Sequence, residues 1–354
     1  MTGRPIAVAV SGGIDSLVAA HLLKQSGHTV FGLHFTTGFE PLPESGLSHI
    51  REQLGIPVHT VDLSAAFQRK VVDYFTRTYA AGRTPNPCLA CNPAIKFGDL
   101  LESARSKGAQ YLATGHYARI IRDAKGRHRL LRGIDSQKDQ SYFLAFLNQE
   151  QLAAARFPLG EMTKDQVRET ARVRGLTPAR RKESQDVCFI LKDYAAFLTD
   201  QPGFGFEPGP IEDLCGNRLG EHPGLHRFTV GQRRGINCPA AQPYYVVRLD
   251  PPRNRLVVGG REDLLSSECR VSDVNWIIPG PDSPLRAAVR VRYRHTAVPA
   301  VVHPGAEGTA RVVFDTPEPA VTPGQGAVFY EEEAVLGGGW IEDTKMNASD
   351  HEDF

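Results

Sequence analysis

The sequence predicts an α/β protein in three parts: an amino-terminal domain built on a parallel sheet, a small central domain and a carboxy-terminal β-barrel-like domain. Strand-like and helix-like runs alternate through the first half of the chain, as in parallel sheets that helices cover on both faces. The Gly- and Pro-rich stretch QPGFGFEPGPIEDLCGNRLGEHPGLH interrupts this pattern just after residue 200. From about residue 244, short β-type runs separated by turn residues dominate.

The first strand is predicted between residues 4 and 11, where apolar residues alternate with small ones. Gly12-Gly13 then open an apolar-periodic helix, and Gly27 is placed to cap its carboxyl end. Further strands are predicted at 28–35, 58–63 and 111–116, and helices at 44–54, 64–80 and 96–107.

The later strands are predicted from the runs YYVVRL, RLVVGG, AAVRVRY, TARVVF and GAVFYE. The predicted domains are 1–198, 199–268 and 269–342, followed by a polar tail, 343–354, that we expect to be disordered.

The composition excludes several protein classes. Of the 354 residues, 41% are hydrophobic and 23% charged, which is typical of a soluble globular protein, and no apolar run reaches the roughly 20 residues of a membrane helix. The amino terminus has no export signal, and six dispersed cysteines do not resemble a secreted disulfide framework. We therefore expect a cytoplasmic protein without a membrane partner. Because the net charge is only +1, any nucleic-acid contact requires locally concentrated basic groups.

The stretch TPNPCLACNPAIKFG places Cys88 and Cys91 three residues apart. Such a pair can hold a metal, close a disulfide or attack a substrate. A closed zinc site needs four ligands, and the sequence has no second pair of this kind. Cys188, in the apolar run VCFI, would by itself be interpreted as a buried core thiol.

The segment SGGIDS joins the first strand to the first helix. Paired glycines allow successive N–H groups to point into one concavity, and the helix amino terminus adds its positive dipole, so the segment suits a phosphate group. It matches neither GxxxxGK[ST] nor GxGxxG. A tight turn with a Ser or Asp cap is the structural alternative.

SGGIDS resembles the pyrophosphate loop of the PP-loop, or N-type ATP pyrophosphatase, superfamily, whose domain is adenine nucleotide alpha hydrolase-like. Four further stretches resemble, in order, the tRNA-specific 2-thiouridylase family: GRTPNPCLACNPAIKFG, ATGHYARI, LLRGIDSQKDQSYFLAFL and SQDVCFI. HPGLHRFTVGQRRGI and TPGQGAVFY continue the match, so that the resemblance covers nearly the whole chain.

The resemblance implies a sulfurtransferase that adenylates the C2 oxygen of the wobble uridine of tRNA with ATP and Mg²⁺, then replaces it with sulfur. Exchange of sulfur between two thiols requires cysteines that are adjacent in the fold. The family assigns these roles to Cys91, as nucleophile, and Cys188, as persulfide carrier, with a transient disulfide between them. The implied partners are the anticodon loops of tRNAs for Lys, Glu and Gln and a sulfur donor such as a cysteine desulfurase or a sulfur-relay protein.

The resemblance also implies the binding residues, with Asp15 close to magnesium. The ATP-binding set is Ala9, Val10, Ser11, Gly12, Gly13, Ile14, Asp15, Ser16, Phe35 and Gly115. The target-base and tRNA contacts are Asn86, Pro87, Cys88, His116, Lys138, Asp139, Gln140, Arg292, Tyr293 and Gln325.

Two basic stretches favour RNA phosphates independently of the family. KDQVRETARVRGLTPARRK (164–182) holds seven Lys or Arg residues against two acids, although a solvated helix face would explain it as well. In RAAVRVRYR, the alternation of Arg290, Arg292 and Arg294 predicts three guanidiniums on one face of a strand with no carboxylate nearby.

Three alternatives remain at this point. The family's mechanism leaves Cys88 unexplained, and if Cys88, Cys91 and Cys188 converge, their thiolates could instead hold a [4Fe–4S] cluster that delivers the sulfur, although many family members carry Asp at position 88. A non-catalytic RNA-binding protein with a metal site is the second alternative. An amide-forming PP-loop synthetase is the third, but it would need neither Cys188 nor an arginine-bearing β-domain.

Overall fold

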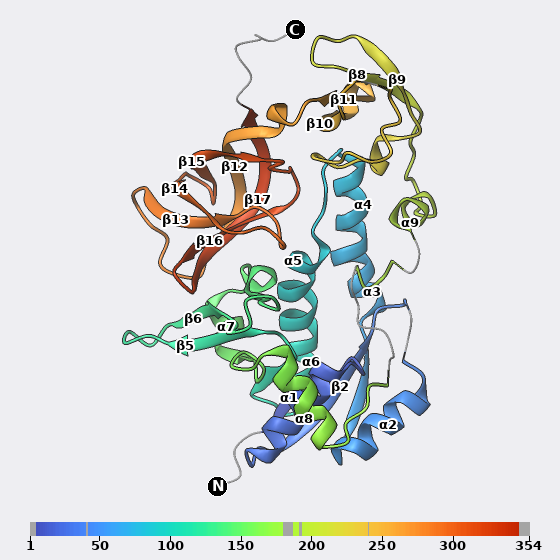
Figure 1. The fold of residues 1–354 in the computed structure, drawn as a ribbon. Helices are drawn as coiled ribbons and strands as arrows, with labels where there is room; N and C mark the ends of the chain where they lie inside the picture. Colours follow the sequence, from blue (N-terminus) through green and yellow to red (C-terminus); the bar gives the residue numbers. More distant parts are fainter. Residues whose placement is uncertain (1–4, 40–41, 180–186, 191–192, 240, 347–354) are drawn as a thin grey trace.

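The structure, a computed structural model, describes residues 5–39, 42–179, 187–190, 193–239 and 241–346. Its strands form a five-stranded, a four-stranded and an eight-stranded sheet. In Figure 1 the five-stranded sheet lies at the bottom and the four-stranded sheet at the upper right, while strands β12 to β17 of the eight-stranded sheet lie at the upper left, with β5 and β6 below them. The predicted α/β fold class with a carboxy-terminal barrel is confirmed.

The five-stranded sheet is parallel throughout, in the order β3-β2-β1-β4-β7. Because the chain passes from β1 to β2 on one side and later returns to β4 on the other, the sheet has a topological switch point between β1 and β4. Its strands are β1 (Ile6–Ala9), β2 (Val30–Thr36), β3 (Val58–Asp62), β4 (Tyr111–Ala113) and β7 (Ala155–Arg156).

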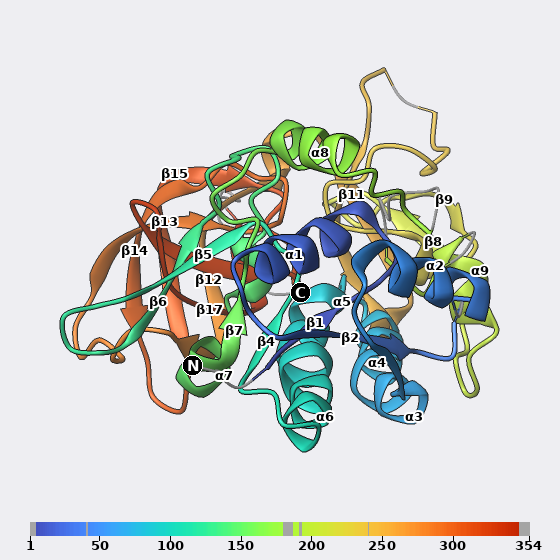
Figure 2. The ribbon, with the colours of Figure 1, turned by 90° about the horizontal axis from the view of Figure 1, so that it is seen from below.

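Helices cover both faces of this sheet, as predicted (Figure 2). On β1, Ile6 and Val8 pack into one core with α1, α2 and α8, while Ala7 packs into the other with the helices between residues 64 and 106. The covering helices are α1 (Ile14–Gln25), α2 (Glu44–Leu54), α3 (Ser64–Phe67), η1 (Gln68–Val72), α4 (Asp73–Ala80), α6 (Leu101–Ser106) and α8 (Lys164–Val173). Shorter helices follow at η3 (Ser141–Leu144), α7 (Gln149–Ala154) and α9 (Tyr194–Thr199).

The cysteine motif is helical, which corrects the predicted helix start at residue 96. One unbroken helical run comprises α5 (Pro87–Cys91), the π-helical η2 (Asn92–Leu100) and α6. Asn86 caps it, since its Oδ1 accepts a hydrogen bond from the Leu89 N–H at 3.3 Å. Pro87 occupies the first turn, where its missing N–H costs no hydrogen bond. The Asn-Pro pair was therefore a start signal that the sequence interpretation overlooked.

The central sheet has the order β10-β11-β8-β9 and its own small apolar core. Its elements are β8 (Gly209–Glu212), β9 (Arg218–His222), η4 (Leu225–Arg227), β10 (Tyr245–Asp250), η5 (Pro251–Arg253) and β11 (Arg255–Gly259).

Six strands of the eight-stranded sheet close into a barrel, because β12 pairs with both β15 and β17. A hairpin from the first part of the chain, β5–β6, extends the sheet by pairing with β17. The elements are η6 (Glu262–Leu264), β12 (Leu265–Trp276), β13 (Leu285–Arg290), β14 (Val298–Pro304), β15 (Ala310–Pro319), β16 (Gly326–Glu331), β17 (Ala334–Met346), β5 (Ala118–Arg122) and β6 (His128–Arg132).

The predicted disordered tail begins too early. Residues 343–346 belong to β17, where Asp343 pairs with Arg270 and Met346 with Ser266 on β12. The ladder hydrogen bonds outweigh the polar composition of this segment. The rest of the predicted tail lies outside the described residues. None of the described helices has the length and apolar character needed to cross a membrane.

Candidate active site at the carboxyl edge of the parallel sheet

The SGGIDS segment forms the predicted turn between β1 and α1. Gly12 has φ +82°, a conformation that favours glycine. Two hydrogen bonds close the turn: the Gly13 N–H donates to Ser11 Oγ, and the Ser16 hydroxyl donates to the Gly13 carbonyl. Ser11 is exposed and α1 begins at Ile14. Ala9 and Val10 lead into this turn from β1. The segment therefore presents a helix amino terminus to a ligand at the carboxyl edge of the sheet.

Asp15 already has partners in this structure. The Nζ of Lys164, the first residue of α8, lies 2.9 Å from each of its carboxylate oxygens, and the Tyr117 hydroxyl donates to Oδ1 at 2.8 Å. The Lys164 side chain is 7% exposed and that of Asp15 is 33% exposed. A ligand that binds the Asp15 carboxylate must therefore compete with the buried ammonium group of Lys164.

The predicted adenosine contacts lie on the strands that flank β1. Phe35 is on β2, partly buried against the main core, and Gly115 follows β4. A Cβ atom on Gly115 would come within 2.9 Å of the Asp15 carbonyl carbon, so a glycine is needed where this loop crosses the start of α1. Both residues lie at the edge where parallel sheets bind ligands.

Cys88 and Cys91 lie on α5, and Cys188 is exposed on the described segment 187–190. Burial raises the pKa of the Cys91 thiol to about 12 and that of Cys88 to about 11. The Lys96 ammonium opposes this rise in both thiols, and Cys188 adds to it electrostatically. An electrostatic effect of Cys188 on the other two thiols requires that it lie near them, so the structure brings together three cysteines that span a hundred residues. The exposure of Cys188 also shows that it is not a buried core thiol, as its apolar neighbours in sequence alone had suggested.

His116 connects the cysteine helix to the predicted nucleotide-binding edge of the sheet. Its Nε2 lies 3.3 Å from Lys96 Nζ, and its Nδ1 lies 2.7 Å from the Thr114 hydroxyl. Burial and, to a smaller extent, Lys96 hold the pKa of His116 well below its usual range. The imidazole is therefore neutral, so that Nε2 accepts from the ammonium and Nδ1–H donates to Thr114.

The barrel contacts the cysteine motif directly. Gln325 Nε2 donates to the carbonyls of Thr84 and Pro85 at 3.0 and 3.1 Å, and its Oε1 lies 3.5 Å from Asn86 Nδ2. A Cβ atom on Gly326 would approach Leu89 Cδ1 to 2.4 Å, so β16 packs tightly on α5. Two motifs that are more than 230 residues apart thus form one surface, which contains Asn86 and Gln325 of the predicted tRNA contacts.

The segment Lys138-Asp139-Gln140 has mainly structural contacts. Asp139 is 4% exposed and accepts from the N–H groups of Gly133 and Ser141, each at 3.1 Å. Gln140 Oε1 accepts from the Tyr117 N–H at 3.1 Å, and Lys138 is half-buried. These contacts hold the segment beside Tyr117, whose hydroxyl donates to Asp15.

The predicted arginine face is wrong. Strand β13 ends at Arg290, whose guanidinium lies 3.1 Å from the buried Asp139 carboxylate, so a carboxylate is near and the three side chains do not share a strand face. Arg292 donates to the carbonyls of Pro319 and Ala320 at 3.3 and 3.4 Å. The alternation in sequence could not reveal a partner 151 residues away. Tyr293 stacks against Phe143 with ring centroids 4.2 Å apart.

The basic stretch 164–182 is only partly described, because residues 180–182 lie outside the described residues. On α8, Arg172 pairs with Glu169 at 2.6 Å, and Lys164 turns inward to Asp15. Lys164 is therefore part of the predicted nucleotide end of the site, around Asp15, a position that the interpretation as an RNA-facing helix missed. Lys96, Thr114 and Tyr117 were also missed, although all three lie within the quoted motifs.

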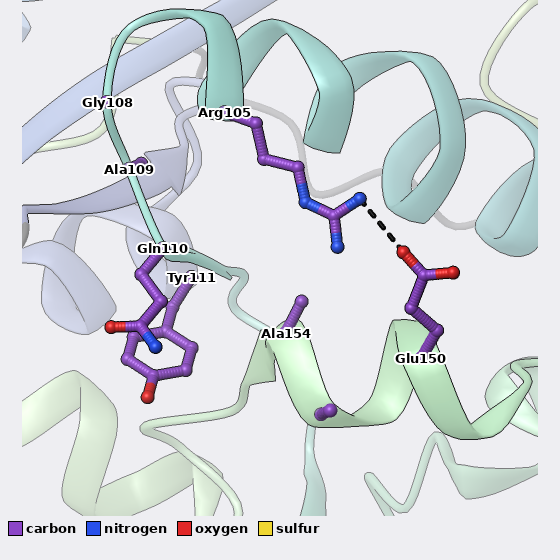
Figure 3. Close-up of a pocket in the computed structure, with 8 residues that line it drawn as sticks. Arg105, Gly108, Ala109, Gln110, Tyr111, Glu150 and Ala154 are labelled. Atoms are coloured by element: carbon purple, nitrogen blue, oxygen red, sulfur yellow. Dashed lines mark ion pairs between the residues drawn. The ribbon is translucent and has the colours of Figure 1, made fainter.

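Two surface hollows lie elsewhere. One is lined by Gln232, Arg233 and Arg234 of the central part. The other lies at the amino-terminal end of β4, where Arg105 reaches toward Glu150 in an ion pair of 3.0 Å beside Gln110 and Tyr111 (Figure 3). No predicted site residue lines either hollow. Within the described ranges, no group of three or more His, Cys, Asp or Glu residues is arranged to hold a metal ion.

Three family profiles match successive parts of the chain and together cover most of it. The profile of a tRNA methyl transferase HUP domain matches residues 4–192, that of a tRNA methyl transferase PRC-barrel domain matches 196–260, and that of an aminomethyltransferase beta-barrel domain matches 266–341.

Three full-length relatives carry the name tRNA-specific 2-thiouridylase MnmA. The protein of Desulfosudis oleivorans is 57% identical over 95% of this chain and 94% of its own length. That of Geobacter metallireducens is 47% identical over 96% and 97%, and that of Solibacter usitatus is 46% identical over 97% and 100%. The chain therefore belongs to the tRNA-specific 2-thiouridylase family.

Proposed function

We propose that this protein is a tRNA 2-thiouridylase, which uses ATP to replace the C2 oxygen of the wobble uridine with sulfur and produces 2-thiouridine, AMP and pyrophosphate. The observation that carries the proposal is the convergence of the glycine turn, the cysteine helix and a barrel loop at one edge of the parallel sheet. Such a site can bring ATP, a thiol pair and an RNA base within reach of one another.

The first step is adenylation. The uridine O2 attacks the α-phosphorus of ATP, the new O–P bond forms, and pyrophosphate leaves with the electrons of the broken P–O bond, while the uracil loses its N3 proton. The exposed N–H groups at Ser11 and the start of α1 suit the phosphates. Phe35 and Gly115 flank the adenosine in this proposal.

Mg²⁺ would accompany ATP and help to neutralise its phosphates. Asp15 would hold it through one carboxylate, with phosphate and water oxygens as the other ligands, as is usual for this ion. The donor fits, because the carboxylate lies at the amino terminus of α1. Lys164 would then be released from Asp15 and could turn to a phosphate oxygen.

Sulfur transfer follows at the cysteines. The terminal sulfur of a Cys188 persulfide attacks C2, and AMP leaves with the electrons of the C–O bond. The Cys91 thiolate then attacks Cys188 Sγ, which forms the Cys91–Cys188 disulfide and leaves the S–S electron pair on the uracil sulfur, while N3 regains a proton. A thiol reductant must return two electrons to the disulfide, which suits a reducing cytoplasm.

The RNA end of the proposal rests on the surface where α5 meets the barrel. Asn86, Pro87 and Cys88 lie there with Gln325, and Cys88 makes a small contribution to the raised pKa of Tyr293, which burial dominates. A base flipped out of an anticodon loop can be read by such a surface. The substrates would be tRNAs for Lys, Glu and Gln, and the sulfur would come from a cysteine desulfurase or a relay protein.

The proposal is tested with purified protein, unmodified tRNA, Mg·ATP and a persulfide-loaded donor. We expect one pyrophosphate for each 2-thiouridine found by nucleoside mass spectrometry. Thiolation without pyrophosphate release, or no thiolation of any of the three tRNAs, would contradict it.

The [4Fe–4S] alternative is separated by preparing the protein without oxygen. The three thiols lie near one another, but in the described residues they are not arranged as the ligands of a metal ion. We expect an iron-free protein that thiolates tRNA from a persulfide. Iron and acid-labile sulfide at cluster stoichiometry, both lost in Cys88→Ala together with thiolation, would favour the cluster instead.

A further inference from the structure

We propose that Lys96 is a further catalytic residue, whose ammonium binds the α-phosphate of ATP and then that of the adenylated uridine, at the junction between the nucleotide end and the cysteines. This inference rests on the proposed function and deepens it. It assigns a phosphate-binding role to a residue of the cysteine helix itself.

The helix geometry brings Lys96 to the cysteine face. Lys96 follows Cys91 by five residues, and in an α-helix two such residues point about 140° apart. The helix is π-wound from Asn92 to Leu100, with i→i+5 hydrogen bonds, so that the residue five positions on returns toward the same face. The Lys96 ammonium acts to lower the pKa of both Cys88 and Cys91, against the larger effect of burial, as expected for a cation on this face.

His116 holds this ammonium at the nucleotide edge. Nζ lies 3.3 Å from His116 Nε2, and the ring is fixed by Thr114 at 2.7 Å. His116 directly follows Gly115, which crosses the start of α1 beside Asp15. Lys96 is thus connected through His116 and Gly115 to the turn at the start of α1, where the phosphates would lie.

The charge environment favours an anionic ligand. Within the described part of the chain, no carboxylate lies within ion-pair distance of Lys96, whereas Lys164 is matched by Asp15. Lys96 is only half-buried, so a ligand can reach it. A neutral imidazole orients the ammonium but does not neutralise it, and a phosphate would complete the site.

The chemistry needs a cation at this place. As O2 bonds to the α-phosphorus and pyrophosphate departs, charge accumulates on the α-phosphate oxygens, and it stays there when AMP later leaves C2. An ammonium that faces both the phosphate and the attacking sulfur lowers both barriers electrostatically. It forms no covalent bond and transfers no proton.

The test compares Lys96→Met, Lys96→Arg and the matched control Lys70→Met. Lys70 lies on η1, where it pairs with Asp99 at the surface at 2.7 Å. In single-turnover reactions with tRNA and Mg·ATP, we expect Lys96→Met to slow pyrophosphate release by about 100-fold. Lys96→Arg should recover part of this loss, and Lys70→Met should match the wild type. Thermal melting and tRNA affinity should be unchanged in all three.

A second measurement separates the phosphate from the thiols. In a Cys91→Ser background sulfur transfer is blocked, and Lys96→Met should still slow pyrophosphate release by the same factor. Normal pyrophosphate release with thiolation lost would overturn the proposal and assign Lys96 to the thiols alone. If Lys96→Met lowers the melting temperature, Lys96→Arg decides whether the role of Lys96 is structural. A purely structural lysine predicts that pyrophosphate release falls only in those variants whose melting temperature also falls. A wild type without tRNA-dependent pyrophosphate release would overturn the proposed function and this role with it.

Discussion

The two ends of the candidate site hold their polar groups in different ways. At the nucleotide end, Asp15 is paired with Lys164 and accepts from Tyr117. At the cysteine end, burial dominates: it raises the pKa of both thiols on α5 and keeps His116 neutral, and Lys96 is the cation that acts on them. In the proposed function, the nucleotide end therefore exchanges partners when it binds its ligand, whereas a thiol at the cysteine end must lose its proton to react.

Because of this difference, substitutions at the two ends should affect stability and activity differently. Removal of Asp15 or Lys164 at the nucleotide end breaks a largely buried ion pair, so that binding and stability change together. Removal of a thiol at the cysteine end leaves only a small cavity, so that chemistry changes while the fold persists. Each of the following experiments sharpens or breaks this comparison.

The largest effect is expected at the cysteine end. Cys91→Ser and Cys188→Ser should each eliminate 2-thiouridine, because neither persulfide attack nor disulfide release can proceed without both sulfurs. Pyrophosphate release should persist in both variants. Cys215→Ser, at an exposed cysteine of the central part, is the control and should thiolate normally. Near-normal thionucleoside levels in cellular tRNA from either variant would remove that cysteine from the mechanism.

The next effect is expected at the nucleotide end. Asp15→Ala should abolish pyrophosphate release and leave tRNA affinity largely intact, but it should also lower the melting temperature, since the nearly buried Lys164 loses a carboxylate that lies 2.9 Å from its Nζ. The double variant Asp15→Ala/Lys164→Met should regain the melting temperature but not the activity. Unchanged pyrophosphate release in Asp15→Ala would show that the phosphates bind elsewhere.

Strand β13 offers a matched pair for stability. Arg290 and Asp139 form an ion pair with side chains 14% and 2% exposed, while Arg286 and Asp315 pair at the surface. Arg290→Ala should lower the free energy of unfolding by about 3 kcal/mol, because it strands a buried carboxylate. Arg286→Ala should cost less than about 1 kcal/mol. Equal urea midpoints for the two variants would mean that the Arg290 pair does not hold the barrel to the segment 138–140.

The smallest effect is expected at Arg292. It is held by two carbonyl groups near the end of β15, so its guanidinium can make at most a limited phosphate contact. Arg292→Ala should weaken tRNA binding slightly and reduce the slope of log affinity against log salt by about 0.7 to 0.9. ATP binding should be unaffected. A slope equal to that of the wild type would remove Arg292 from the RNA surface.

The sequence by itself determined the features that depend on neighbours along the chain. The strand, glycine turn and helix at residues 6–25 follow from apolar periodicity and from the backbone freedom of Gly12, and both are local properties. The alternation of strands and helices predicted the parallel sheet for the same reason. The order of the motifs predicted the family, since long peptide matches do not depend on the fold.

Only the tertiary structure decided which groups meet. Lys164 reaches Asp15 across 149 residues, and Arg290 reaches Asp139 across 151, so no spacing in sequence could predict either pair. The π-wound turn that returns Lys96 to the face of Cys91 is likewise invisible in the sequence, because a shift from i→i+4 to i→i+5 hydrogen bonds follows from packing around the helix. Local propensities fix the elements, but burial and long-range pairing fix the charges, and the charges give this site its chemistry.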